Sequence, residues 1–179
     1  MQFQPVQWFD ELDSTNRHLL RLCDSAETQG GMVVACHRQT AGRGRLARAW
    51  QSGAGENLTF SLYLDLPCDP VAAMTLPLAV GLAVSESLDE FGIASEVKWP
   101  NDVLVDGRKL CGILCERPAG GSGVVVGVGL NVNMTSAAAM GIDRPATSMR
   151  MEAGREFDIE IVPARVLATM QLRLGQWAT

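Results

Sequence analysis

Three apolar segments joined by short glycine-containing turns constrain the fold of this chain more than any other feature. Residues 103–105, 109–116 and 124–132 are predicted strands, because each is largely apolar. Asp106-Gly107 joins the first two and is typical of a tight β-hairpin. Glycine-rich residues 120–123 join the second and third. Strands connected this closely pair antiparallel, so we expect hairpins to build part of the sheet.

Helices are predicted before and between the strand groups. The first covers residues 14–26, where an apolar stripe follows polar residues suited to an N-cap. The second begins at Asp69-Pro70 and carries no charge over residues 71–84, which predicts burial on most sides. Pro77 is expected to bend this helix or to mark its true start. A third begins near residue 161, with Val166, Met170 and Leu174 on one face.

The remaining strands complete an α+β prediction. They are expected at residues 6–9, 32–36, 57–66 and 96–99. Residues 58–64 alternate strictly, with leucines and a phenylalanine on one face and Thr59, Ser61 and Tyr63 on the other. Helices lying between groups of hairpin-connected strands predict a central mixed β-sheet with helices packed on one face.

Length and composition limit the function classes. A chain of 179 residues forms one domain, and a net charge of −5 disfavours general nucleic-acid binding. No apolar stretch is long enough to span a bilayer, and no secretory signal is evident at the N-terminus. Five cysteines without a CxxC pair indicate reduced, mostly buried thiols and a cytoplasmic protein.

A glycine- and arginine-rich loop at residues 38–56 is locally basic, although the chain as a whole has a negative net charge. Between Arg38 and Trp50 it holds four arginines and no acid, which suggests a small anionic ligand. Residues 42–47 fit the pattern G-x-G-x-x-A, but no helix is expected to follow, so a dinucleotide-binding turn is excluded. The alternative is a solvated basic loop.

Three further segments carry polar groups at strand ends. Lys98-Trp99-Pro100-Asn101-Asp102 interrupts a strand, although Asn and Asp there also suit an ordinary turn. Lys109 lies in an otherwise apolar strand, so it is either at the sheet edge or directed into a site, and Gly112 leaves room for a ligand. Asn131 could read a purine edge or simply cap its strand. No His or Cys cluster suggests a resident metal.

Taken together, these segments resemble biotin protein ligases. The resemblance rests on Ser14-Thr15-Asn16, the loop from Gln39 to Arg45, the Lys98–Asp102 segment, residues 109–114 and residues 127–131. It implies a class II aminoacyl-tRNA synthetase-like fold and a catalytic domain over residues 1–179. It also implies that the family's small C-terminal β-barrel and an N-terminal DNA-binding domain are absent.

The resemblance implies activation of biotin with MgATP to biotinyl-5′-AMP and transfer of biotin to a lysine of a biotin carboxyl carrier protein. The residues implied to bind biotin are Ser14, Thr15, Asn16, Gln39, Gly42, Arg43, Gly44, Arg45, Lys109 and Gly112. Those implied to bind ATP are Arg43, Arg45, Arg48, Trp50, Lys98, Asn101, Asp102, Lys109 and Asn131. Arg43, Arg45 and Lys109 are the implied catalytic residues, and Asp102 is the implied Mg²⁺ ligand.

The resemblance also frames the partners and the alternatives. It implies no nucleic-acid or membrane partner and leaves a homodimer open. Ala47 stands where family members often have glycine, so the loop is expected to close differently. The alternatives are a protein that binds biotin or biotinyl-adenylate without efficient transfer, and a lipoate or octanoate ligase of the same superfamily.

Overall fold

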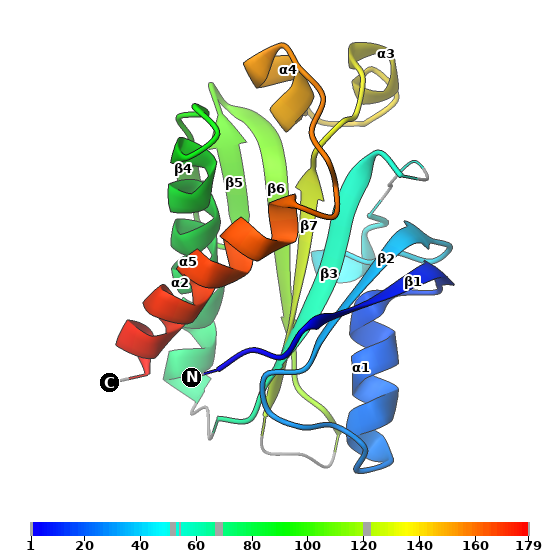
Figure 1. The fold of residues 1–179 in the computed structure, drawn as a ribbon, viewed down its shortest axis with the longest axis vertical. Coiled ribbons are helices and arrows are strands. Elements are labelled where there is room, and N and C mark those ends of the chain that lie inside the picture. Colours follow the sequence, from blue (N-terminus) through cyan, green and yellow to red (C-terminus); the bar gives the residue numbers. More distant parts are fainter. Residues whose placement is uncertain (1, 51–52, 54, 67–69, 120–122, 179) are drawn as a thin grey trace.

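The computed structural model describes residues 2–50, 53, 55–66, 70–119 and 123–178 as one sheet with helices on both faces (Figure 1). Its strands are β1 (Val6–Leu12), β2 (Val33–Gln39), β3 (Asn57–Leu64), β4 (Glu96–Lys98), β5 (Asp102–Val105), β6 (Arg108–Glu116) and β7 (Val124–Asn131). Its helices are α1 (Thr15–Asp24), the 3-10 turn η1 (Arg45–Ala47), α2 (Pro70–Asp89), α3 (Ser136–Ala139), α4 (Met149–Ala153) and α5 (Val162–Trp177).

The sheet has the strand order β1-β2-β3-β7-β6-β5-β4. β1 pairs parallel to β2, and all other neighbours pair antiparallel, which confirms the predicted mixed sheet. The hairpin between β5 and β6 turns at Asp106 and Gly107, with φ of 48° and 74°. Two successive positive φ values match the turn that suits the twist of a two-residue hairpin.

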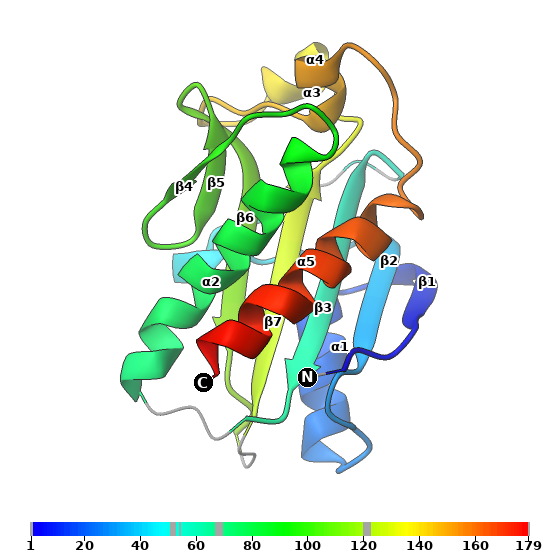
Figure 2. The same cartoon turned by 60° about the vertical axis from the view of Figure 1, so that its left-hand side comes forward.

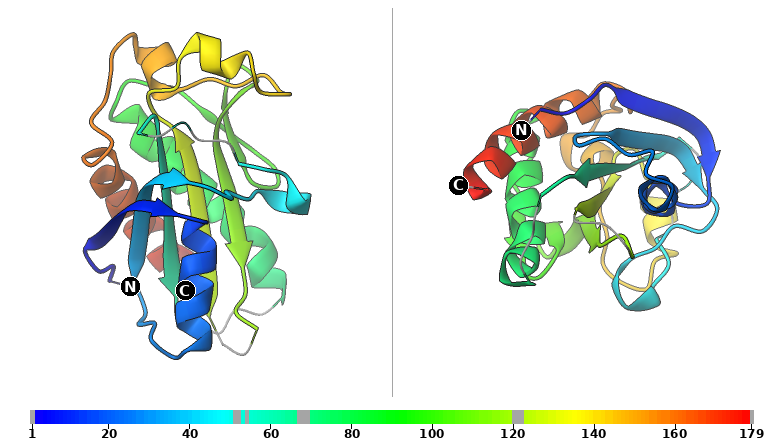
Figure 3. Two further views of the ribbon diagram at one scale, coloured as in Figure 1. Left: turned by 90° about the vertical axis from the view of Figure 1, so that its right-hand side faces the viewer. Right: turned by 90° about the horizontal axis from the view of Figure 1, so that it is seen from below.

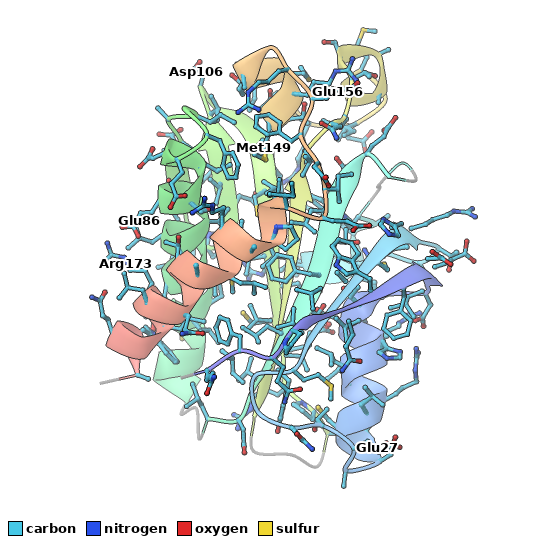
Figure 4. All side chains as sticks on the ribbon, in the orientation of Figure 1. Glu27, Glu86, Asp106, Met149, Glu156 and Arg173 are labelled. Atoms are coloured by element: carbon cyan, nitrogen blue, oxygen red, sulfur yellow. The ribbon has the colours of Figure 1, made fainter. Side chains whose placement is uncertain are left out.

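One face of the sheet packs against α2 and α5, which lie side by side across it (Figure 2). The leucines and phenylalanine of β3 point into this core, as their alternation predicts. Val166, Met170 and Leu174 of α5 are fully buried, which confirms the predicted helical face. Near the outer surface of the pair, Arg173 Nε donates to Glu86 Oε2 at 2.6 Å (Figure 4).

The opposite face carries α1, so the expectation that helices cover one face needs correction (Figure 3). Leu19 of α1 packs on Val34, Tyr63 and Val125, which alternate with the residues of the main core. The residues of β3, and all but one residue of β7, are buried, so both faces of these strands must be covered. The second helix layer follows from that requirement.

Two details of the helices differ from the sequence predictions. α2 begins at Pro70, so Pro77 lies inside the helix and does not mark its start. Pro77 removes one backbone hydrogen bond, and burial of Leu76, Val80 and Val84 compensates for the loss. The cap expected at Asp69 and most of the turn expected at residues 120–123 lie outside the described residues.

The described cysteines are buried or partly buried, as the sequence predicts. Cys36 and Cys111 are buried, whereas Cys23 and Cys115 are partly exposed. Burial raises the pKa of the Cys111 thiol to about 12, which keeps it protonated and unreactive. Cys68 lies outside the described residues. Across the described part of the chain, helices are too short or too polar to cross a bilayer.

Candidate active site

A cavity of about 890 Å³ opens on the face of the sheet that carries α1. This volume lies in the range of small-molecule and cofactor sites. Its lining includes all of the sequence-predicted site residues except Gly42: Ser14, Thr15, Asn16, Gln39, Arg43, Gly44, Arg45, Arg48, Trp50, Lys98, Asn101, Asp102, Lys109, Gly112 and Asn131. Gly42 lines a smaller hollow, which shares Gln39, Ala49 and Trp50 with the cavity. Segments up to 117 residues apart in sequence therefore meet at one site.

Two glycines of β7 form part of the cavity floor. A Cβ at Gly127 would lie 2.2 Å from Asn16 Oδ1, and a Cβ at Gly129 would lie 2.4 Å from the Trp50 ring. Both contacts are closer than real Cβ atoms allow. Asn16 and Trp50 can therefore pack against the sheet only because β7 has no side chains at these positions.

A β-bulge directs Lys109 into the cavity. Val103 pairs with Cys111 and Leu104 with Lys109, so Leu110 is an extra residue on β6. In a regular strand, Lys109 would share a face with Cys111 and point into the core. The bulge shifts the alternation by one residue, so Lys109 lies on the same face as Gly112. The Lys109 Nζ atom accordingly lies only 3.0 Å from where a Gly112 Cβ would be. β6 is an interior strand, so the sheet-edge alternative for Lys109 is wrong.

The Lys109 ammonium has two neighbours in the site. It lies 2.6 Å from Asp102 Oδ1 and 5.8 Å from the centre of the Trp50 ring. The carboxylate and the aromatic face both attract the ammonium group. This pairing holds a cation at the cavity wall beside β5.

Asn101 ties the Lys98–Asp102 segment to β6. Its Nδ2 donates to Ile113 O at 2.8 Å, and its carbonyl accepts from Ile113 N at 2.9 Å. Asn101 Oδ1 lies 3.5 Å from Arg45 Nη1, at the limit of a hydrogen bond. The segment is therefore more than an ordinary turn, because Asn101 also connects β6 to the arginine loop.

The arginine loop forms a small hairpin over the cavity instead of an irregular coil. Gly44 N donates to Arg48 O at 2.7 Å and Trp50 N to Gly42 O at 2.9 Å, with η1 at the tip. Leu46 is 82% exposed there and has a φ of 56°. The left-handed position is thus Leu46, and the expected difficulty at Ala47 does not arise in this conformation.

A polar network lies beneath this loop at the N-terminus of α1. Ser14 caps the helix through its side chain. Gln39 Oε1 accepts from Thr15 N at 2.9 Å. The Ser61 hydroxyl lies 2.7 Å from Thr15 Oγ1 and 2.6 Å from Asn16 Oδ1, within hydrogen-bond distance of both. Ser14, Thr15, Asn16 and Ser61 are buried, so the hydrogen bonds of this network fix the shape of the cavity before a ligand enters.

Asn131 caps its strand and also holds a neighbouring segment. Its Nδ2 donates to Thr147 O at 2.9 Å and Lys109 O at 3.3 Å. Lys109 N in turn donates to Pro145 O at 2.9 Å. The amide hydrogens of Asn131 are thus committed to backbone carbonyls, which favours the capping alternative over reading of a purine edge through its amino group.

Sequence reasoning missed three parts of the site. Glu116 contacts Asn16 and Arg43, Ser61 joins the polar network, and residues 141–146 supply part of the cavity wall. Ser61 had a usable signal, since it is a polar residue on the second face of an alternating strand. The sequence carries no such signal for Glu116 or for residues 141–146, because their contacts depend on the order of the strands in the sheet.

The comparisons with known proteins agree on one family. The model of the Biotin/lipoate A/B protein ligase family matches residues 8–133. The bifunctional ligase/repressor BirA of Bacillus subtilis is 35% identical, with 98% of this chain and 55% of the relative covered. The biotin--[acetyl-CoA-carboxylase] ligase of Mycobacterium tuberculosis is 37% identical, with 92% and 62% covered. The chain spans about half the length of the Bacillus subtilis relative.

Solved structures match the fold equally well. The biotin protein ligase of Aquifex aeolicus in complex with biotin and ATP has a TM-score of 0.86 and 33% identity, covering 98% of this chain and 72% of that chain. The fold and the cavity therefore define a class II synthetase-like domain of the kind found in biotin protein ligases. The chain belongs to the Biotin/lipoate A/B protein ligase family. The comparisons lend no support to a homodimer.

A ligand bound in the cavity is expected to protect residues 42–50 from amide hydrogen exchange. The loop hairpin contacts the cavity, so a ligand beneath it should lower the frequency of local opening. Exchange measured with and without biotin should slow by about tenfold at these amides, which corresponds to about 1.4 kcal/mol. Amides of α5, on the far face, serve as the internal control. Unchanged exchange at residues 42–50 would contradict closure of this loop over biotin.

Proposed function

We propose that this protein is a biotin protein ligase. It joins biotin to ATP, forming biotinyl-5′-AMP and releasing pyrophosphate, and then transfers biotin to a lysine of a biotin carboxyl carrier protein or domain. The observation that carries this proposal is the convergence of Lys109, Arg43, Arg45 and Arg48 on one cavity. Family membership and the biotin and ATP bound by the Aquifex aeolicus structure support the substrates.

Adenylation requires no protein nucleophile. An oxygen of the biotin carboxylate attacks the α-phosphorus of ATP, a new P–O bond forms, and the bond to the departing pyrophosphate breaks. Both reactants are anions, and negative charge builds on the phosphate oxygens as they react. The protein must therefore bring them together and neutralise that charge. Arg43, Arg45 and Lys109 are the groups placed to do so.

We assign different parts of the cavity to the two substrates. Ser14, Thr15, Asn16, Gln39 and Gly112 form the end assigned to biotin, with Gly42 and Gly44 shaping the loop above it. The ATP end is assigned to Arg48, Trp50, Lys98, Asn101, Asp102 and Asn131. In that end, the Trp50 indole Nε1 is buried and has no hydrogen-bond partner among the described residues, so it is a donor left for a ligand.

Magnesium enters as part of the MgATP substrate. The described residues contain no group of three or more His, Cys, Asp or Glu side chains suited to hold a metal alone. Mg²⁺ is typically bound by one or two carboxylates together with substrate phosphates, and Asp102 fits that role. Coordination by Asp102 would exchange part of its contact with Lys109 and leave that ammonium available to the reacting anions.

The second half-reaction transfers the biotinyl group. The carrier lysine attacks the carbonyl carbon of the mixed anhydride, an amide forms, and AMP departs. A closed loop over the cavity would protect the anhydride from hydrolysis until the carrier arrives. We assign this reaction to the cytoplasm, where carboxylases and reduced thiols are found together.

Pyrophosphate release in the presence of MgATP tests the proposal. Release that depends on biotin supports it, whereas release that depends on lipoate or octanoate would favour the other branch of the family. Release with none of the three acids, or tight biotin binding without release, would contradict the proposed activity. A carboxylate-free biotin amide is the matched control, because it should bind without supporting release.

A further inference from the structure

Glu116 is an acidic side chain at a site expected to bind two anions. It lies at the end of β6, on the same face as Gly112 and Leu114, and its side chain is 24% exposed. A carboxylate in this position should by itself weaken the binding of anions. Glu116 instead contacts two residues of the site, Arg43 and Asn16.

The Glu116 carboxylate joins three separate parts of the site. Its Oε1 accepts from Arg43 Nη2 at 2.8 Å, and its Oε2 lies 3.1 Å from the same nitrogen. Its Oε2 also accepts from Asn16 Nδ2 at 2.8 Å. The loop hairpin, the first turn of α1 and the sheet therefore meet at one carboxylate. A charge-assisted contact with two partners, mostly shielded from water, is stronger than an exposed surface pair.

The geometry leaves Arg43 available to a ligand. Both contacts to Glu116 use Nη2 alone. The Nε atom of Arg43 is buried and has no hydrogen-bond partner within the part of the chain that the structure describes. A buried donor without a partner is costly unless a ligand or water completes it. Glu116 thus holds one corner of the guanidinium while another donor remains for an anion.

Asn16 is fixed by the same carboxylate. One Nδ2 hydrogen is used by Glu116 and the other by Leu114 O at 3.1 Å, while Oδ1 accepts from Ser61. This fully used amide has one orientation in the network. Glu116 therefore also determines which atom of Asn16 faces the space above Gly127.

We propose that Glu116 is a positioning residue that anchors Arg43, and with it the hairpin of residues 42–50, over the cavity. The anchor keeps the loop close to its ligand-bound arrangement, so less ordering remains to be done when biotin binds. The opposite role would be a latch that withholds Arg43 from anions. The two roles predict opposite changes in KM when Glu116 is removed. The effect on KM rests on the proposed function; the effect on the loop does not.

Hydrogen exchange of the ligand-free protein tests the anchor without any activity. In Glu116→Gln, which keeps the side-chain size but loses the charge, residues 42–50 should exchange about tenfold faster than in the wild type, as expected for loss of about 1.4 kcal/mol. Glu11→Gln is the matched control, because it removes the charge of an exposed 2.7 Å pair with Arg38, which lies in β2 just before the loop. Equal exchange in all three proteins would overturn the proposal.

Kinetics of biotin-dependent pyrophosphate release separates an anchor from a latch. Glu116→Gln should raise the KM for biotin about tenfold while changing kcat less than about threefold, and Glu11→Gln should change neither. A lowered KM would show a latch, and an equal loss of kcat at unchanged KM would show a different role; either overturns the proposal. If the wild type releases no pyrophosphate with biotin, the proposed function fails, and the exchange experiment still decides the anchor.

A double mutant shows whether Glu116 acts through Arg43. In an Arg43→Ala background, Glu116→Gln should change the Kd for biotin less than about twofold, because the contact to Arg43 is already gone and the glutamine carbonyl oxygen can still accept from Asn16 Nδ2. A full tenfold effect in that background would show that Glu116 acts independently of Arg43 and would overturn the proposal. Binding is the readout here, since Arg43→Ala is itself expected to slow adenylation.

Discussion

Replacing Lys109 with alanine is expected to slow formation of biotinyl-5′-AMP by about 10²–10³-fold, the typical cost of removing one donor that stabilises transition-state charge. Lys109 lies at the cavity wall, 2.6 Å from Asp102 Oδ1. Removing the ammonium withdraws a positive charge from the reacting phosphate and leaves the Asp102 carboxylate unpaired near two anionic substrates. Both changes oppose the reaction. Single-turnover formation of the adenylate measures the effect directly.

Two controls make the Lys109 result decisive. Arg165→Ala removes a cation paired with Glu90, outside the cavity lining, and should leave the rate within about twofold. Thermal unfolding should show that Lys109→Ala remains folded. A near wild-type rate in Lys109→Ala would contradict the role assigned to it, and Lys98 would become the better candidate for that charge.

Replacing Gly127 with alanine is expected to reduce both stability and biotin binding. The new Cβ would lie 2.2 Å from Asn16 Oδ1, and Asn16 cannot move without breaking its contacts to Leu114, Glu116 and Ser61. Overpacking of this kind typically costs about 1–3 kcal/mol. We expect the midpoint of thermal unfolding to fall by several degrees and the Kd for biotin to rise by about tenfold or more.

Gly175→Ala is the matched control for Gly127→Ala. Gly175 lies in α5, and a Cβ there would meet nothing within 4 Å. Alanine in a helix should be neutral or slightly stabilising and should leave biotin binding unchanged. Equal behaviour of the two variants would show that the polar network beside Gly127 adapts, and that the cavity is not pre-shaped by Asn16.

Local patterns predicted most of the fold. The alternation of residues 58–64 fixed which side of β3 faces the main core, and Asp106-Gly107 located a hairpin that the structure confirms. The second helix layer was missed because Leu19 and its partners belong to three separate strands and a helix. Nothing local in residues 14–26 says which face of the sheet the helix covers.

The site was predicted less completely than the fold, for a related reason. The polar and cationic residues were identifiable by type, but the aim of Lys109 depends on a bulge at Leu110 that a run of apolar residues does not reveal. Glu116 pairs with Arg43 across 73 positions of sequence and with Asn16 across 100. Such contacts are set by the order of strands, which local propensity cannot give.

In the function proposed here, this cavity both makes and retains biotinyl-5′-AMP. The most direct measurement is to incubate the protein with biotin and MgATP, remove free small molecules by gel filtration, and determine the mass of whatever stays bound. We expect a compound with the mass of biotinyl-5′-AMP, formed only when both substrates are present and lost in Lys109→Ala. Recovery of unreacted biotin alone, or of no ligand after a complete reaction mixture, would contradict it.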